Sequence, residues 1–181
     1  MRLTKDTSAP RLELFDMRGQ PVHLGQPSGR RSLVCFFRDA ACPFCNFRIY
    51  ELTLHHQALS EKGLDIIAVF TSDVAAVKRF VARTPRPFVV IADPSSSAHT
   101  AYRIESSLVG KFKAITTRVS TLLRGLRMVG LAGLNTSNLL PADFLIDERG
   151  NIAEAWYGND AGDRIPFARV HAFLEAPVPA R

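Results

Sequence analysis

Two cysteines separated by two residues, Cys42 and Cys45, are the residues in this sequence best suited to chemistry. Residues 32–37 form a short apolar run of the kind found in strands that are buried on both faces. Apolar residues follow at helical spacing from Pro43 onward, and proline is favoured at the first position of a helix. Both sulfurs are therefore expected in a first helical turn, where free backbone N–H groups favour thiolate over thiol. The pair predicts thiol redox chemistry.

The two-residue spacing also predicts how such a pair would work. A thiolate attacks a disulfide or a hydroperoxide, and the second sulfur then attacks the first, which closes an intramolecular disulfide. The cycle needs no bound cofactor and no metal, and we expect neither. A structural zinc site usually has four ligands, but there is no second cysteine pair, and His55 and His56 lie about 20 Å along the same predicted helix.

The third cysteine, Cys35, has a different setting. It lies inside the apolar run, and free cysteine is among the residue types that are most often buried. Three cysteines cannot all pair, so a framework of structural disulfides is not expected. We predict that Cys35 is an unreactive core residue.

The elements around the cysteine pair indicate an α/β domain. The strand at 32–37, a helix from Pro43 to about Gly63 and a second buried strand at 64–70 form a strand–helix–strand unit, which implies a parallel pair. The 181 residues, of which 46% are hydrophobic and 22% charged, suit a single domain over 1–181. Further predicted elements are a hairpin at 12–15 and 21–24, a helix at 73–83, a strand at 88–92, a hairpin at 144–147 and 151–156, and a closing helix at 164–174.

A basic segment interrupts this pattern within a predicted helical insertion at 105–138. Residues 111–130 contain no acidic residue, and their apolar residues follow helical spacing, so we predict a cationic amphipathic helix. Its apolar face would pack on the domain or on a second copy in a homodimer, which we favour, or it would lie on an anionic membrane surface. The cations are Lys111, Lys113, Arg118, Arg124 and Arg127, and the apolar residues are Phe112, Ile115, Val119, Leu122, Leu126 and Val129.

The overall charge and the N-terminus bear on partners and location. The formal charge of +6 favours acidic partners, but the basic segment lacks interleaved exposed aromatic residues, so nucleic acid is not an expected partner. The N-terminus lacks the apolar run of a secretory signal, and no apolar stretch reaches the length of about 18 residues that spans a bilayer. We expect a cytoplasmic protein.

Two blocks, FFRDAACPFCN at 36–46 and LPADFLID at 140–147, resemble the alkyl hydroperoxide reductase and thiol-specific antioxidant family. The resemblance is to its peroxiredoxin-like branch with a two-cysteine motif, and it covers roughly residues 9–175. It implies a thioredoxin-like fold, which is a central mixed β-sheet flanked by helices, with an N-terminal hairpin extension. It also implies a thiol-dependent enzyme that receives electrons from a thioredoxin- or glutathione-type thiol donor.

The resemblance gives roles to four positions. Family peroxidases have a proline, a threonine and the peroxidatic cysteine, and these align with Arg38, Cys42 and Cys45. Pro141 matches the cis-proline that faces the cysteine pair in thioredoxin-like disulfide reductases, where the peroxidases place an arginine. Arg38 either supplies positive charge beside the thiolate or is a solvated residue at a strand end. By analogy with thioredoxin-like proteins, Cys42 would be the nucleophile. The alignment with the family peroxidases selects Cys45 instead.

Three functions follow from these observations. The leading one is a thiol-disulfide oxidoreductase that cycles Cys42 and Cys45 between dithiol and disulfide. The second is a thiol-dependent peroxidase in which Cys45 reduces hydroperoxides. The third belongs to another class: a redox-sensing or membrane-docking interaction protein that uses residues 111–130.

Overall fold

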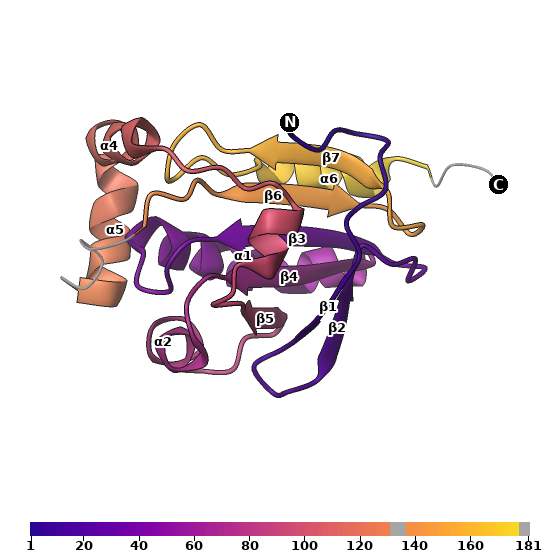
Figure 1. Cartoon of the computed structure of the whole chain (residues 1–181), viewed down its shortest axis with the longest axis horizontal. Helices are drawn as coiled ribbons and strands as arrows, with labels where there is room; N and C mark the ends of the chain where they lie inside the picture. The colour runs from indigo at the N-terminus through magenta and orange to yellow at the C-terminus, as the bar shows by residue number, and fades with distance from the viewer. Residues whose placement is uncertain (131–136, 178–181) are drawn as a thin grey trace.

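The computed structural model describes residues 1–130 and 137–177 and shows a five-stranded mixed sheet with helices on both faces (Figure 1). The strand order is β5-β4-β3-β6-β7, in which β3 runs parallel to β4 and antiparallel to β6. This is the predicted α/β architecture. The sheet contains β3 (Arg31–Phe37), β4 (Leu64–Phe70), β5 (Val89–Ala92), β6 (Ala142–Ile146) and β7 (Ile152–Tyr157), and β1 (Leu12–Phe15) pairs with β2 (Pro21–Leu24) as the expected N-terminal hairpin.

The helices divide between the two faces of the sheet. One face is covered by α1 (Pro43–Glu61), α2 (Val74–Phe80) and α6 (Phe167–Glu175), and the other by α3 (Ser97–Ala101) and the hairpin. Two more helices, α4 (Leu108–Thr117) and α5 (Val119–Val129), lie at one end of the molecule (Figure 1). In the described residues, no helix combines the length and the apolar character needed to cross a bilayer.

The central strand β3 contributes to both cores because its side chains alternate between the faces. Leu33, Cys35 and Phe37 point to the α1 side, whereas Val34 and Phe36 point to the other. Cys35 has no exposed surface, so its prediction as a core residue is confirmed. Burial, together with the negative charge of Asp143, raises the pKa of the Cys35 thiol well above its usual value.

Residues that precede β3 cover both edges of the sheet. At the β7 edge, the amide of Asp6 donates to the carbonyl of Ile152 at 2.8 Å, and the amide of Ile152 donates to the carbonyl of Thr7 at 2.8 Å. At the β5 edge, the amide of Met17 donates to the carbonyl of Val90 at 3.0 Å. The N-terminal segment therefore protects backbone groups that an edge strand would otherwise expose.

The basic segment differs from the prediction of one continuous helix, because α4 and α5 are separated at Arg118 (φ −121°, ψ 43°). The hydroxyls of Thr116 and Thr117 donate to the carbonyl of Lys113 at 3.0 and 2.7 Å, and such back-bonding bends helices. The Arg118 side chain then forms an ion pair with Asp160 at 2.8 Å. The ion pair with Asp160, a residue outside the basic segment, therefore holds the chain at the point where α4 ends and α5 begins.

The two helices also pack differently. On α5, the buried positions are Gly125 and Val129, and this helix lies against α1. A Cβ atom at Gly125 would lie 2.2 Å from the backbone oxygen of Pro43, so only glycine permits this approach. The favoured alternative, packing on the domain, therefore describes the side of α5 that contains Gly125 and Val129, although Val119 is exposed, and α4 exposes its large apolar side chains.

Candidate redox site

The cysteine pair lies where β3 leads through a short loop into α1, as the sequence predicts. Cys42 is the N-cap residue of α1, and Pro43 takes the first helical position. The side chain of Asn46 holds the loop by donating to the carbonyl of Ala40 at 2.6 Å and to that of Cys42 at 3.1 Å. These bonds keep the two sulfurs in the first turn of the helix.

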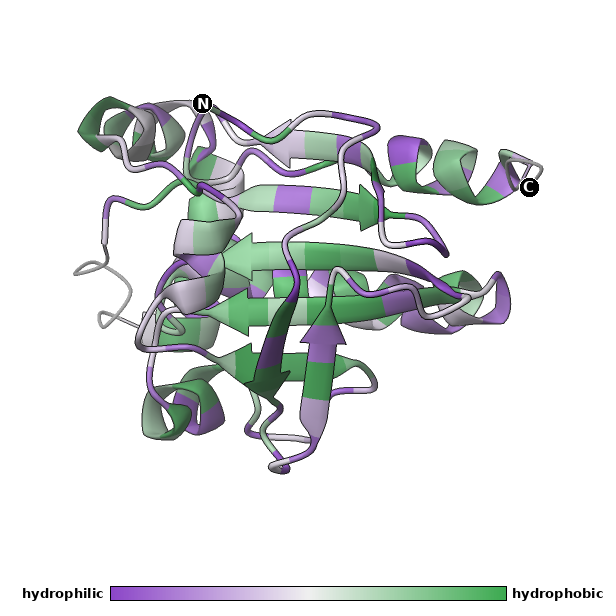
Figure 2. Ribbon diagram, turned by 45° about the vertical axis from the view of Figure 1, so that its right-hand side comes forward, coloured by the Kyte–Doolittle hydropathy of each residue, from purple (hydrophilic) through white to green (hydrophobic). Residues whose placement is uncertain are grey.

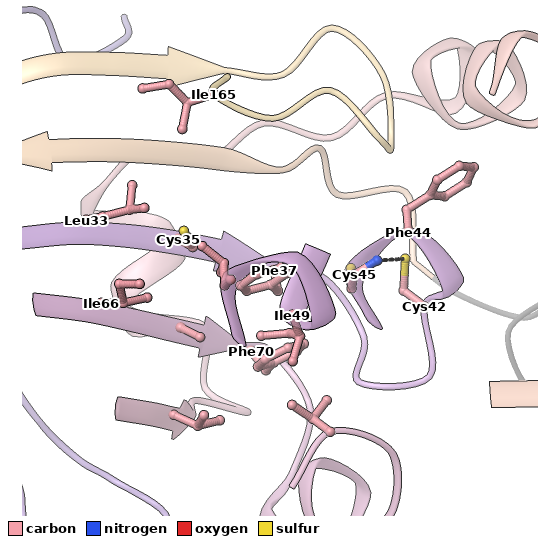
Figure 3. Close-up of a cluster of buried hydrophobic side chains, with 14 of the residues drawn as sticks. Leu33, Cys35, Phe37, Cys42, Phe44, Cys45, Ile49, Ile66, Phe70 and Ile165 are labelled. Carbon is pink, nitrogen blue, oxygen red and sulfur yellow. Dashed lines mark hydrogen bonds between the residues drawn. The ribbon is translucent and has the colours of Figure 1, made fainter. Parts of the chain in front are cut away.

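The Cys42 sulfur faces backbone groups at the helix start. The amide of Cys45 donates to Cys42 Sγ at 3.4 Å (Figure 3). Neither cysteine has exposed surface. A negative charge on Cys42 Sγ would therefore be held by a free helical N–H group in a site without solvent.

Arg38 lies beside this sulfur and is not a solvated residue. Its side chain is buried, Nη2 donates to Cys42 Sγ at 3.1 Å, and Nη1 donates to the carbonyl of Ser137 at 3.0 Å. A guanidinium at this distance stabilises a thiolate through both charge and hydrogen bonding. Of the two alternatives for Arg38, the structure shows the one next to the sulfur.

These contacts shift the pKa values of the two cysteines in opposite directions. Burial alone would raise the pKa of Cys42, but hydrogen bonds from Cys45 and the charge and hydrogen bond of Arg38 outweigh it and lower the pKa to about 6. Burial and the adjacent Cys42 thiolate raise the pKa of Cys45 well above its usual value. Near neutral pH the arrangement favours a thiolate on Cys42 and a thiol on Cys45.

A second arginine near the pair was not anticipated from the sequence. Arg164 is buried; its Nη1 donates to Asp143 Oδ1 at 3.0 Å and to the carbonyl of Phe36 at 2.9 Å. Its guanidinium carbon lies 4.1 Å from the centre of the Phe37 ring. The positive charge partly offsets the rise in the pKa of Cys45. The available signal was Asp143, an acidic residue inside the otherwise apolar strand β6, which implies a buried cationic partner.

Pro141 precedes β6, but its expected cis conformation is wrong. The described residues contain no cis peptide bond, so the bond between Leu140 and Pro141 is trans. The carbonyl of Pro141 accepts a hydrogen bond from the amide of Gly158 at 2.9 Å. The proline therefore continues into the strand without the turn that a cis bond would introduce.

Comparison with known proteins supports the same chemistry. The profile of the AhpC/TSA family matches residues 6–155. A protein from Mycobacterium tuberculosis, whose name assigns it provisionally to the peroxiredoxins, is 23% identical over 158 residues, which is 86% of each chain.

Solved structures match the fold at low sequence identity. Peroxidoxin BcpB from Mycobacterium tuberculosis has a TM-score of 0.65 at 13% identity, with 96% of this chain and 95% of that chain covered. The reduced 2-Cys peroxiredoxin from Plasmodium vivax has a TM-score of 0.67 at 14% identity, with 96% and 81% covered. A protein from Chlorobium tepidum, provisionally described as the thiol:disulfide interchange protein DsbE, has a TM-score of 0.59 at 20% identity, with 85% of each chain covered.

Peroxidoxin-like and disulfide-interchange structures thus share one thioredoxin-like fold with this chain, and the fold does not distinguish between their activities. The family profile, in contrast, covers most of the sequence and includes the cysteine pair. The chain belongs to the AhpC/TSA family and is a thiol-dependent oxidoreductase.

Proposed function

We propose that this protein is a thiol-disulfide oxidoreductase in which Cys42 is the attacking thiolate and Cys45 is the resolving thiol. The observation that carries this assignment is the contact of 3.1 Å between Arg38 Nη2 and Cys42 Sγ. With the amide of Cys45, it supplies two stabilising groups for a charge on Cys42. The peroxidase alignment, which selects Cys45, has no comparable support, because burial and the hydrogen bond and charge of Cys42 all raise the pKa of that thiol.

The proposed cycle transfers two electrons from the pair to the substrate. The Cys42 thiolate attacks a substrate disulfide, and one substrate sulfur leaves as a thiolate while a mixed disulfide forms. Cys45 then loses its proton and attacks Cys42 Sγ, which releases the second substrate sulfur and leaves a Cys42–Cys45 disulfide. A thiol donor of the thioredoxin or glutathione type reduces this disulfide and completes the cycle.

Trapping the mixed disulfide tests the assignment. Reduced Cys42→Ser and Cys45→Ser variants are each mixed with oxidised glutathione at neutral pH, and the adducts are located by mass spectrometry. We expect Cys45→Ser to accumulate a glutathione adduct on Cys42 and Cys42→Ser to form almost none. A Cys35→Ala variant is the control and should react like the unmodified protein. An adduct that accumulates on Cys45 in Cys42→Ser would reverse the assignment.

The burial of both sulfurs favours a second candidate, reduction of a hydroperoxide. Because neither cysteine is exposed, a small oxidant would reach Cys42 Sγ more easily than a folded protein would. The Cys42 thiolate would attack one peroxide oxygen, the O–O bond would break, and the other oxygen would leave as an alkoxide or hydroxide that takes up a proton. Arg38 is placed to stabilise that developing negative charge. Cys45 would then condense with the sulfenic acid on Cys42, releasing water.

The rate of thiol loss distinguishes the two substrates. The reduced protein is mixed with hydrogen peroxide in a stopped-flow instrument, and the experiment is repeated with Cys42→Ser and Cys45→Ser. A fast phase that is lost in Cys42→Ser supports peroxidase activity with Cys42 as the attacking residue. A rate no higher than that of a free thiol leaves disulfide exchange as the function.

A further inference from the structure

Helix α4 carries its large apolar side chains on the side that faces solvent. Leu108, Val109, Phe112 and Ile115 are 61%, 78%, 66% and 39% exposed, whereas Ala114 is buried. At 100° per residue, the four exposed residues share one face of the helix. Surface helices of globular proteins usually show the opposite arrangement, with the apolar face turned toward the core.

The inner face of α4 explains why the helix does not rotate to bury these residues. Gly110 lies against the domain, and a Cβ atom there would be 2.7 Å from the Leu140 side chain and 3.1 Å from the carbonyl oxygen of Asn159. The amide of Ala161 also donates to the carbonyl of Gly110 at 3.3 Å. The inner face is therefore closely packed at Gly110, and a larger residue there would require the Leu140 side chain and the loop at Asn159 to move.

The charge around this face is positive. Lys113 is exposed on α4, and Arg124 and Arg127 are exposed on α5. The sequence contains no acidic residue between Glu105 and Asp143. Arg118, which lies between the two helices, is neutralised by ion pairs with carboxylates of the loop that follows β7. A second copy docked through the same face would bring like charges together, so the surface suits an anionic partner.

We infer that α4 docks this protein on an anionic lipid surface, with its apolar outer face at the headgroup boundary and the cations of α4 and α5 near the lipid phosphates. An exposed apolar face containing phenylalanine and leucine, next to basic residues, is the pattern of helices that lie in a membrane interface. The helix lies at one end of the molecule (Figures 1 and 2). The inference is independent of the proposed redox function.

Docking would place the redox site close to the lipid surface. Helix α5 follows α4 directly and rests through Gly125 on the backbone of Pro43, the residue next to Cys42. The contact between α4 and the loop at Asn159 and Ala161 fixes α4 relative to the sheet. The surface and the site therefore belong to the same packed end of the molecule.

Sedimentation of the full chain with vesicles tests the inference. The vesicles contain either phosphatidylcholine alone or phosphatidylcholine with phosphatidylglycerol, at low and at high salt. We expect binding only to the anionic vesicles, and weaker binding at high salt. Val109→Ser with Phe112→Ser, and separately Lys113→Glu with Arg127→Glu, should each lower the partition coefficient by at least about tenfold. Circular dichroism of each variant verifies that it is folded.

A matched charge variant makes the result specific to this surface. Arg11→Glu with Arg18→Glu changes the net charge by the same amount, and both residues are exposed in or near the N-terminal hairpin. This variant should keep most of the binding. Equal loss in both charge variants, or no binding to anionic vesicles at low salt, would overturn the inference. So would sedimentation equilibrium showing a dimer that Phe112→Ser dissociates, because the face would then bind a second copy.

Discussion

Burial and charge act on the Cys42 thiol in opposite directions, and Arg38 is the side chain that supplies the positive charge. Replacing Arg38 with methionine keeps the bulk of the side chain and removes the charge. Because an opposite charge at this distance typically lowers a pKa by about 1 to 3 pH units, we expect the pKa of Cys42 to rise by that amount from its value of about 6. The pH dependence of Cys42 alkylation, followed by mass spectrometry, measures the change.

Arg38→Lys is the matched control for this prediction. Lysine keeps the charge but not the geometry of the guanidinium, so the pKa should rise less than in Arg38→Met. An unchanged pKa in Arg38→Met would assign the acidity of Cys42 to the helix start and the Cys45 hydrogen bonds alone.

Loss of one partner from the buried Asp143–Arg164 pair is expected to lower the stability of the fold. Both side chains are buried, so Arg164→Met would leave the carboxylate of Asp143 without its ionic partner. Breaking a buried pair in this way costs about 3 to 5 kcal/mol of unfolding free energy. Urea denaturation of the reduced protein measures this loss. The double variant Arg164→Met with Asp143→Leu should recover much of it, and a single variant as stable as the double would contradict the prediction.

At the scale of the elements, the contact between α5 and α1 depends on a single glycine. Gly125→Ala would place a methyl group 2.2 Å from the backbone oxygen of Pro43, so the helices would have to move apart. Overpacking of this kind costs about 1 to 3 kcal/mol. Thermal unfolding measures the effect, with Ser120→Ala on the exposed side of α5 as the control. If the two variants have equal stability, the close approach of the helices is not important.

The elements that the sequence predicted well are those specified by local pattern. The apolar run of β3 and the helical spacing after Pro43 lie next to each other, so the position of Cys42 at the start of α1 followed from the sequence. The apolar periodicity did not predict the break between α4 and α5, where Arg118 pairs with Asp160, which lies 42 residues further along the chain. Helical periodicity groups apolar residues on one face, but it does not say whether a neighbour covers that face.

The same reasoning explains why the sequence predicted some features of the redox site and not others. The two alternatives for Arg38 differed in how far its side chain lies from a cysteine sulfur. Only the folded chain fixes that distance. Arg164 was missed because its partners, Asp143 and the carbonyl of Phe36, come from two different strands. The cis conformation of Pro141 was inferred from a motif, and the trans bond shows that the motif did not determine it.

For the whole molecule, the acidity of Cys42 links folding to pH. A cysteine has a pKa of about 8.5 in the unfolded chain, whereas in the folded, reduced protein Cys42 has a pKa of about 6. The unfolded state therefore binds more protons between these values, and stability rises with pH across that window, by up to about tenfold in the folding equilibrium constant per pH unit. This stabilisation is lost as pH falls through 6.

Comparison with Cys42→Ser isolates the contribution of Cys42 to the pH dependence of stability. Burial also lowers the pKa of His99, which makes stability rise with pH in the acidic part of the range, but His99 is present in both proteins. Urea denaturation of the reduced unmodified protein and of Cys42→Ser, from pH 6 to pH 8, should therefore give a difference that grows with pH. A difference that stays constant would show that Cys42 has the same pKa in both states.

The cover that the N-terminal residues provide for the sheet also bears on self-association. The segment around Asp6 and Thr7 occupies backbone groups of β7, and Met17 occupies those of β5, so the two outer strands are shielded by the chain that precedes β3. An uncovered strand is a template on which another chain can add, and long runs of such additions produce aggregates. The N-terminal segment thus closes a sheet that would otherwise be open at both sides. A chain from which residues 1–24 have been removed would lose both covers at once, so its copies would be free to join strand to strand into fibrous assemblies.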